Sequence, residues 1–174
     1  MQQANSLLLR LVSRVGLFRQ MDIDCVAALL QHASSVKFNA GDIVFEEGRE
    51  GHSMYIVTEG AFEVFRQTDG KIITIAIIEA GQHFGEIALV ANRTRSASVR
   101  AVRNSTAIRL SKRAVMGEEK AALQLFRNMA NMLAKSLVSL NDEVILYRAN
   151  AQAMAEPDGS SGESGHSHYS SVNR

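Results

Sequence analysis

The spacing of apolar residues changes twice along the chain, and each spacing predicts a different kind of element. In residues 1–35, apolar side chains recur every three or four positions, which is the pattern of amphipathic helices. Gly16 is expected to end the first helix, and Asp22 is expected to be the N-cap of the second. The apolar residues of the first helix are Leu7, Leu8, Leu11, Val12 and Val15.

Residues 36–117 contain short runs in which apolar and polar side chains alternate between glycines, and this pattern predicts strands. Asp69-Gly70 separates two of the runs and predicts a hairpin turn. Turns at roughly 8–12 residue intervals are typical of an all-β roll or sandwich. We therefore expect an α+β, mainly β fold: a jelly-roll-like, eight-stranded β-roll with N-terminal helices, a short helix near 112–117 and a long C-terminal helix. The alternating runs are DIVFEE, MYIVTE, AFEVFRQ, KIITIAII, SASVRAVR and STAIRLS.

Residues 118–154 return to helical spacing, with apolar residues at the first and fourth positions of successive heptads. Glu143 and Arg148 have the spacing of an ion pair between the helices of a parallel dimer. We expect a homodimer through this helix, and the alternative is a helix that packs only on its own β-roll. A second apolar edge, with Leu125 and Met132, allows both arrangements at once. The heptad seam consists of Leu123, Phe126, Ala130, Leu133, Leu137, Leu140, Val144, Tyr147, Ala151 and Met154.

Composition narrows the class of protein. The chain has 174 residues, of which 46% are hydrophobic, and this is ample for one folded core. No apolar run approaches the length of a transmembrane helix. Cys25 is the single cysteine, which excludes a disulfide framework and favours a cytoplasmic location. Residues 155–174 are rich in serine and glycine and are expected to be a disordered tail, in which His166 and His168 are assigned no metal site.

The candidate chemistry lies in residues 83–99, HFGEIALVANRTRSASV. Gly85 ends a predicted strand before a short helix, and the free N–H groups of a helix N-terminus attract anions. Arg95 can return to clamp a phosphate with two hydrogen bonds. A carboxylate at Glu86 suits neutral hydroxyls, such as those of a ribose, better than it suits an anion. The segment therefore predicts a compact ribose-phosphate site, and a structural ion pair between Glu86 and Arg95 is the alternative.

This segment resembles the phosphate-binding cassette of the cyclic nucleotide-binding domain family. The family pattern of Phe-Gly-Glu, a short helix, arginine, a small residue and alanine is matched by FGEIAL and by Arg95, Ser96 and Ala97. The glycines upstream of the cassette also have the family's spacing, and the resemblance covers about residues 10–150. Thr94 stands where many members have proline, which leaves the loop less rigid but keeps the contacts. The matching upstream glycines are Gly41, Gly48, Gly51 and Gly60.

The resemblance implies contacts for the phosphate and the sugar. Gly85 and the amides that follow it, at Glu86, Ile87 and Ala88, would face the cyclic phosphate. The Glu86 carboxylate would accept a hydrogen bond from the ribose 2′-hydroxyl. Arg95 would pair with an exocyclic phosphate oxygen.

The resemblance also implies contacts for the base. Ser96, followed by Ala97, would donate a hydrogen bond to the phosphate or to a purine. Ile75 would pack on the base from the strand before the cassette. In the catabolite activator protein branch the long helix reads the base, and Asn141 is the candidate here because Leu140 replaces a polar residue. We expect cAMP as the ligand, and cGMP or a cyclic dinucleotide stays an alternative.

The function that follows is a stand-alone receptor rather than an enzyme. The sequence contains no nucleophile elbow, no metalloprotease motif and no P-loop, so we expect no catalytic residue, no cofactor and no metal. Nucleotide binding would shift a hinge near Gly117, and the long helix would signal to a protein effector of unknown identity. No DNA partner is expected, because the tail is too short for a helix-turn-helix domain. The alternatives are a ligand-free interaction module with a degenerate site and a cytoplasmic regulatory piece of a channel.

Overall fold

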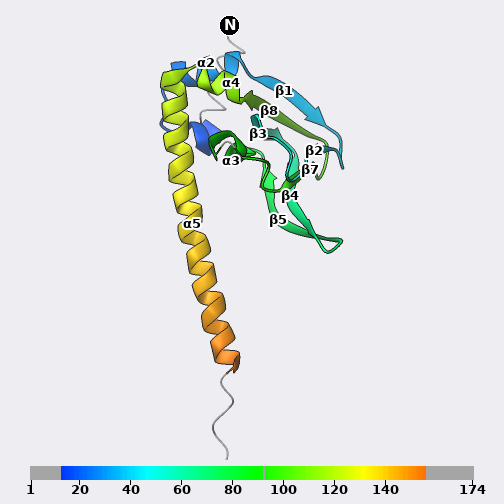
Figure 1. The fold of residues 1–174 in the computed structure, drawn as a ribbon. Coiled ribbons are helices and arrows are strands. Elements are labelled where there is room, and N and C mark those ends of the chain that lie inside the picture. Colours follow the sequence, from blue (N-terminus) through cyan, green and yellow to red (C-terminus); the bar gives the residue numbers. More distant parts are fainter. Residues whose placement is uncertain (1–12, 92, 156–174) are drawn as a thin grey trace, which may run out of the picture. The chain divides into compact units, whose positions relative to one another are not determined.

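The computed structural model describes residues 13–91 and 93–155. They form eight strands in two four-stranded antiparallel sheets, with helix α2 before them and the long helix α5 after them (Figure 1). This confirms the predicted mainly β fold. The strands are β1 (Ser34–Phe38), β2 (Ile43–Phe45), β3 (Ser53–Glu59), β4 (Ala61–Thr68), β5 (Lys71–Glu79), β6 (His83–Phe84), β7 (Ser98–Ala101) and β8 (Ser105–Ser111). The helices are the 3-10 helix η1 (Gly16–Phe18), α2 (Ile23–Gln31), α3 (Glu86–Ala91), α4 (Lys112–Met116) and α5 (Glu119–Ala155).

Some of the sequence predictions concern residues that lie outside these ranges. The described part of the chain begins with Ser13 and Arg14, which are helical. Val15 is extended, so the helix ends directly before Gly16, where its end was predicted. The predicted tail begins as the last residue of α5, and its other residues are not described. The named residues outside the described ranges are Leu7, Leu8, Leu11, Val12, His166 and His168.

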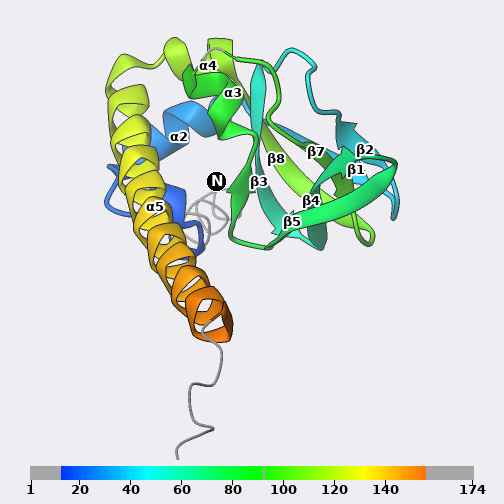
Figure 2. The same cartoon turned by 60° about the horizontal axis from the view of Figure 1, so that its bottom comes forward.

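Strand β3 separates two apolar cores, because its side chains alternate in direction. Met54 and Ile56 pack with apolar residues of α2 and α5. Val57 and the partly buried Tyr55 pack inside the roll, together with Phe84 of β6. The sheet orders are β1-β8-β3-β6 and β2-β7-β4-β5. Figure 2 shows α2 and α3 on the side of β3 that faces away from β2 and β7.

Local sequence patterns account for most of the strands but not for all of them. Asp69 and Gly70 form the predicted turn between β4 and β5, with φ angles of 53° and 75°, as a type I′ turn requires. β1 and β6 are missing from the alternating runs. β1 is an edge strand without a buried residue, and β6 has only two residues, so neither shows a period.

Asp22 lies at the predicted N-cap position of α2, but its side chain makes no capping hydrogen bond. Its Oδ2 accepts a hydrogen bond from Gln124 Nε2 at 2.9 Å and pairs with Lys120 Nζ at 2.8 Å. The carboxylate therefore ties α2 to the first turns of α5. The predicted N-cap position is confirmed, but the side-chain oxygens bind partners that are distant in the sequence instead of the local amides.

Two units share α5, residues 1–133 and residues 134–174. In the first unit, Leu125 and Met129 are buried in the core, and Met132 packs against it. In the second unit, residues 134–152 are exposed. Neither α5 nor another helix of the described residues is both long and apolar enough to cross a membrane. The large apolar residues of the predicted seam that are exposed are Leu123, Leu133, Leu137, Leu140, Val144 and Tyr147.

Candidate functional site

The turn from β6 into α3 depends on glycine at position 85. Gly85 has a φ of +81°, a left-handed conformation that L side chains rarely adopt. A Cβ added there would lie 2.8 Å from Arg95 Nη1 and 3.3 Å from the carbonyl oxygen of Ser53. The absence of a side chain therefore lets the guanidinium approach the backbone directly before the first turn of α3.

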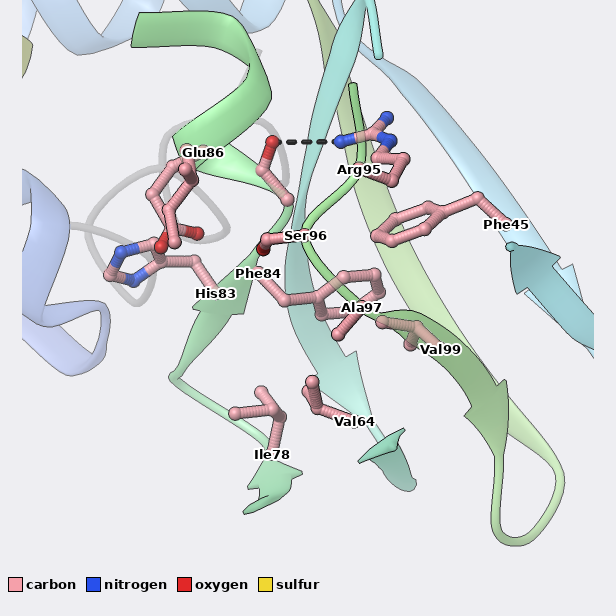
Figure 3. A pocket seen from close by; sticks show the side chains of 12 residues that line it. Phe45, Val64, Ile78, His83, Phe84, Glu86, Arg95, Ser96, Ala97 and Val99 are labelled. Carbon is pink, nitrogen blue, oxygen red and sulfur yellow. Dashed lines mark hydrogen bonds between the residues drawn. The ribbon is translucent and has the colours of Figure 1, made fainter. Parts of the chain in front are cut away.

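Arg95 is almost fully buried, with 6% of its surface exposed. Its Nη1 donates to the Gly85 carbonyl oxygen at 2.8 Å (Figure 3), and its Nη2 donates to the Ser53 carbonyl oxygen at 2.7 Å. The guanidinium carbon lies 3.9 Å from the centroid of the Phe45 ring, in a cation–π contact. Burial lowers the pKa of Arg95, although arginine stays charged at any physiological pH.

Backbone hydrogen bonds hold Arg95 in the wall of the roll. Its amide donates to the Arg49 carbonyl oxygen at 2.8 Å, and its carbonyl oxygen accepts from the Gly48 amide at 2.9 Å. Glu50 and Thr94 form an isolated antiparallel bridge beside them. The loop between β2 and β3 thus positions the arginine, although the two segments are more than forty residues apart in the sequence.

Glu86 is the first residue of α3, and its side chain is half-buried. The Oε2 of Glu86 and the Nε of Arg95 are buried atoms without a hydrogen-bond partner among the described residues. The predicted alternative of an ion pair between these two residues is wrong, since both Nη groups of the arginine bind backbone carbonyls instead. A buried polar atom without a partner is costly, so both atoms are suited to bind a polar ligand.

A cavity of about 130 Å³ opens between the cassette and the strands, with Glu86 and Arg95 in its wall (Figure 3). Among the described lining residues, the polar side chains are the guanidinium of Arg95, the carboxylate of Glu86, the imidazole of His83 and the hydroxyl of Ser96. Most of the other lining side chains are apolar. The lining residues that the sequence predicts are Gly85, Glu86, Ile87, Arg95, Ser96 and Ala97. The lining residues that it does not predict are Phe45, Val64, Ile78, His83, Phe84 and Val99.

Three of the unpredicted lining residues, Phe45, Val64 and Ile78, come from strands that precede the cassette in the sequence. Val64 of β4 is paired with Val99 of β7, so both side chains lie on the same face. Val99 lies between the polar residues Ser98 and Arg100, and this alternation was the available signal for it. His83 had no signal, because a strand of two residues has no period. Among the described residues no group of three or more His, Cys, Asp or Glu side chains is placed to hold a metal ion.

One predicted site residue, Ile75, does not belong to the described wall of the cavity. Ile75 is 54% exposed, and Ile78 lines the cavity in its place. The register of β4 and β5 shifts beside Ile75, so the side chains beyond the shift change face. Ala88 lies in α3, and its contact with the phosphate stays a prediction. Asn141 is an exposed residue of the second unit, and its contact with a base stays a prediction.

Comparison with known proteins identifies the class that this fold and cavity define. Residues 35–117 match the family described as cyclic nucleotide-binding domain. The solved structure of a cyclic nucleotide-binding-like protein from Brucella abortus is 30% identical, with a TM-score of 0.54, and the match covers 60% of this chain and 90% of that one. The chain belongs to the cyclic nucleotide-binding domain family.

Other relatives include transcription regulators. The catabolite activator protein of Thermus thermophilus has a TM-score of 0.69 at 26% identity, and the match covers 76% of this chain and 63% of that one. The CRP-like cAMP-activated global transcriptional regulator of Mycobacterium tuberculosis is 26% identical over 137 residues, which are 76% of this chain and 61% of the regulator. Further curated relatives, 37% identical, are matched over only 24% of their own length.

Proposed function

We propose that the chain is a cytoplasmic cAMP receptor that signals by a conformational change and has no catalytic activity of its own. The observation that carries the proposal is the pair of unpartnered buried atoms, Glu86 Oε2 and Arg95 Nε, on two residues that line one cavity. A cyclic nucleotide offers a complementary pair of groups, since its ribose hydroxyl is a donor and its phosphate is an anionic acceptor. A relative described as cAMP-activated supports cAMP as the nucleotide.

The phosphate contacts in this proposal come from the β6–α3 turn. Gly85 and the amides of Glu86, Ile87 and Ala88 face the phosphate, as the order strand, glycine and helix favours. The Arg95 guanidinium neutralises the single negative charge, through Nε or by exchanging one carbonyl bond for a phosphate oxygen. Because the guanidinium is already immobilised on Phe45, little side-chain entropy is lost on binding.

The sugar and the base contact the other residues of the cavity wall. Glu86 Oε2 accepts from the 2′-hydroxyl, and Ser96 donates to the phosphate or to the purine. The base lies against Val64 and Ile78, whose apolar side chains line the cavity, and Asn141 would complete its edge. A guanine would need further donors and acceptors in this wall, so we favour cAMP over cGMP.

In this proposal, the conformational change that follows nucleotide binding is transmitted through the junction between α4 and α5. Gly117 caps the C-terminus of α4 in a helical conformation, and α5 begins two residues later. Closure of residues 85–96 on the nucleotide would change the packing of the β-roll against the helices and so the position of α5. Two conformations that differ in nucleotide affinity by about 1–3 kcal/mol are sufficient for such a switch. The protein effector that reads α5 is unknown.

Calorimetric titration with cAMP, cGMP and a cyclic dinucleotide tests the proposed function. We expect saturable binding of one cAMP per chain, with cGMP weaker. If none of the three nucleotides binds or raises the melting temperature, the chain is a ligand-free interaction module and the proposal is wrong.

The exposed heptad seam of α5 supports a second part of the proposal, a homodimer. Replacing Leu133 and Leu137 by lysine would put two charges per chain into that seam, and we expect the dimer to dissociate. Sedimentation equilibrium measures the result. The matched control replaces Asn131 and Ser139, exposed residues of α5 outside the seam, by lysine and should leave the mass unchanged. If the variant with both leucines replaced still sediments as a dimer, the seam is not the dimer interface.

A further inference from the structure

His83 lines the cavity, but none of the proposed contacts with the nucleotide uses it. It belongs to β6, where it pairs with Ile56 of β3, and its side chain is half-buried. Figure 3 shows the imidazole beside the Glu86 carboxylate, with the Arg95 guanidinium in another part of the wall. An ionisable ring thus lies next to a carboxylate that lines the cavity.

Burial lowers the pKa of His83 below its ordinary value of 6.5. The Glu86 carboxylate has a smaller, opposite effect, because it favours the charged imidazolium. From β3 the facing partner is the apolar Ile56, and no other charged side chain of the described residues contributes. His83 is therefore neutral at neutral pH, and the pH at which it takes up a proton lies below its ordinary pKa.

We infer that His83 is a positioning residue for Glu86: the neutral imidazole leaves the carboxylate free for the ribose hydroxyl, whereas the imidazolium pairs with it and withdraws it from the nucleotide. The role rests on the proposed function, since it needs Glu86 to bind the sugar. Glu86 Oε2 has no hydrogen-bond partner among the residues that the structure describes, so a neighbouring cation is a direct competitor for it. The charge of the phosphate is compensated by Arg95 and does not replace the carboxylate as the partner of His83.

The sign of the pH dependence follows from this competition. The nucleotide binds the form with neutral His83 more tightly, so binding lowers the pKa of His83 further and releases a proton. Affinity is therefore constant above the pKa of His83 in the free protein and decreases below it. One proton gives a limiting slope of about one decade of affinity per pH unit.

Calorimetric titration of the full chain with cAMP at several pH values, in two buffers of different ionisation enthalpy, tests the inference. We expect wild-type affinity to fall by about threefold or more between about pH 7.5 and about pH 5, with proton release on binding. His83→Gln should keep the affinity at neutral pH, lose most of the pH dependence and release no proton. The control His52→Gln removes an exposed histidine outside the cavity wall, paired with Glu50, and should keep the wild-type profile.

The outcomes separate this inference from the function on which it rests. If the wild type binds cAMP with an affinity that does not change over this pH range, or if His83→Gln retains the wild-type profile, His83 has no positioning role although the receptor stands. If circular dichroism shows that His83→Gln is unfolded, His83→Phe carries the same expectation. A wild-type chain that binds no cyclic nucleotide at neutral pH overturns the receptor and, with it, the role of His83.

Discussion

Replacing Arg95 by alanine is expected to lower cAMP affinity by at least about tenfold and up to about a hundredfold. A hydrogen bond to a charged group contributes about 1.5–3 kcal/mol, and here it would also compensate the charge of the phosphate. The loss should exceed that of an exposed arginine, because the guanidinium is buried and fixed by Phe45 and by two carbonyl oxygens.

Binding and folding must be measured together for this variant, since Arg95 also donates to Gly85 and Ser53. Calorimetry gives the affinity, and thermal unfolding gives the folded fraction at the same temperature. Arg103→Ala is the control: it removes the same charge from outside the cavity wall, where its Nη2 donates to the Gly60 carbonyl oxygen at 3.3 Å. Unchanged cAMP affinity in a folded Arg95→Ala variant would place the ligand elsewhere.

Replacing Gly85 by alanine is expected to lower cAMP affinity by about tenfold or more and to reduce stability by about 1–3 kcal/mol. The new Cβ would be held at positive φ and would meet Arg95 Nη1 at 2.8 Å. The guanidinium would have to move, and the amides of the β6–α3 turn would move with the backbone. Both the guanidinium and these amides are proposed to bind the phosphate, so the substitution would displace groups of the phosphate site.

Gly70→Ala separates backbone strain from the change at the site. Gly70 has a φ of +75°, close to that of Gly85, but nothing lies within 4 Å of an added Cβ. The control should lose stability by a similar strain energy and keep cAMP affinity, as measured by denaturant unfolding and by calorimetry. Equal affinities in the two variants would mean that the β6–α3 turn does not form the phosphate site.

The part of the site that the sequence predicts is contiguous in the chain. Gly85, Glu86, Arg95 and Ser96 lie within one cassette, where residue type and order are sufficient to define a candidate. No role could be assigned to His83 from the sequence, because its proposed role depends on the Glu86 carboxylate, which the β6–α3 turn places beside it.

The apolar wall required knowledge of strand register. The run KIITIAII in β5 is nearly continuous in apolar residues, so its pattern does not show which isoleucines face inward. The register shift beside Ile75 changes the phase of the strand, and Ile78 rather than Ile75 lines the cavity. At Asp22 the N-cap position could be predicted, but the side-chain partners Lys120 and Gln124 could not. Both cases depend on contacts with another element, which the pattern of a single segment does not contain.

A crystal structure of the chain with saturating cAMP would show whether the cavity is the receptor site. We expect nucleotide in the cavity, with the phosphate on Arg95 and on the amide groups after Gly85, and with the ribose hydroxyl on Glu86. The apolar wall at Val64 and Ile78 would contact the base. Nucleotide bound at another surface, or a cavity that remains without nucleotide at saturation, would contradict the account.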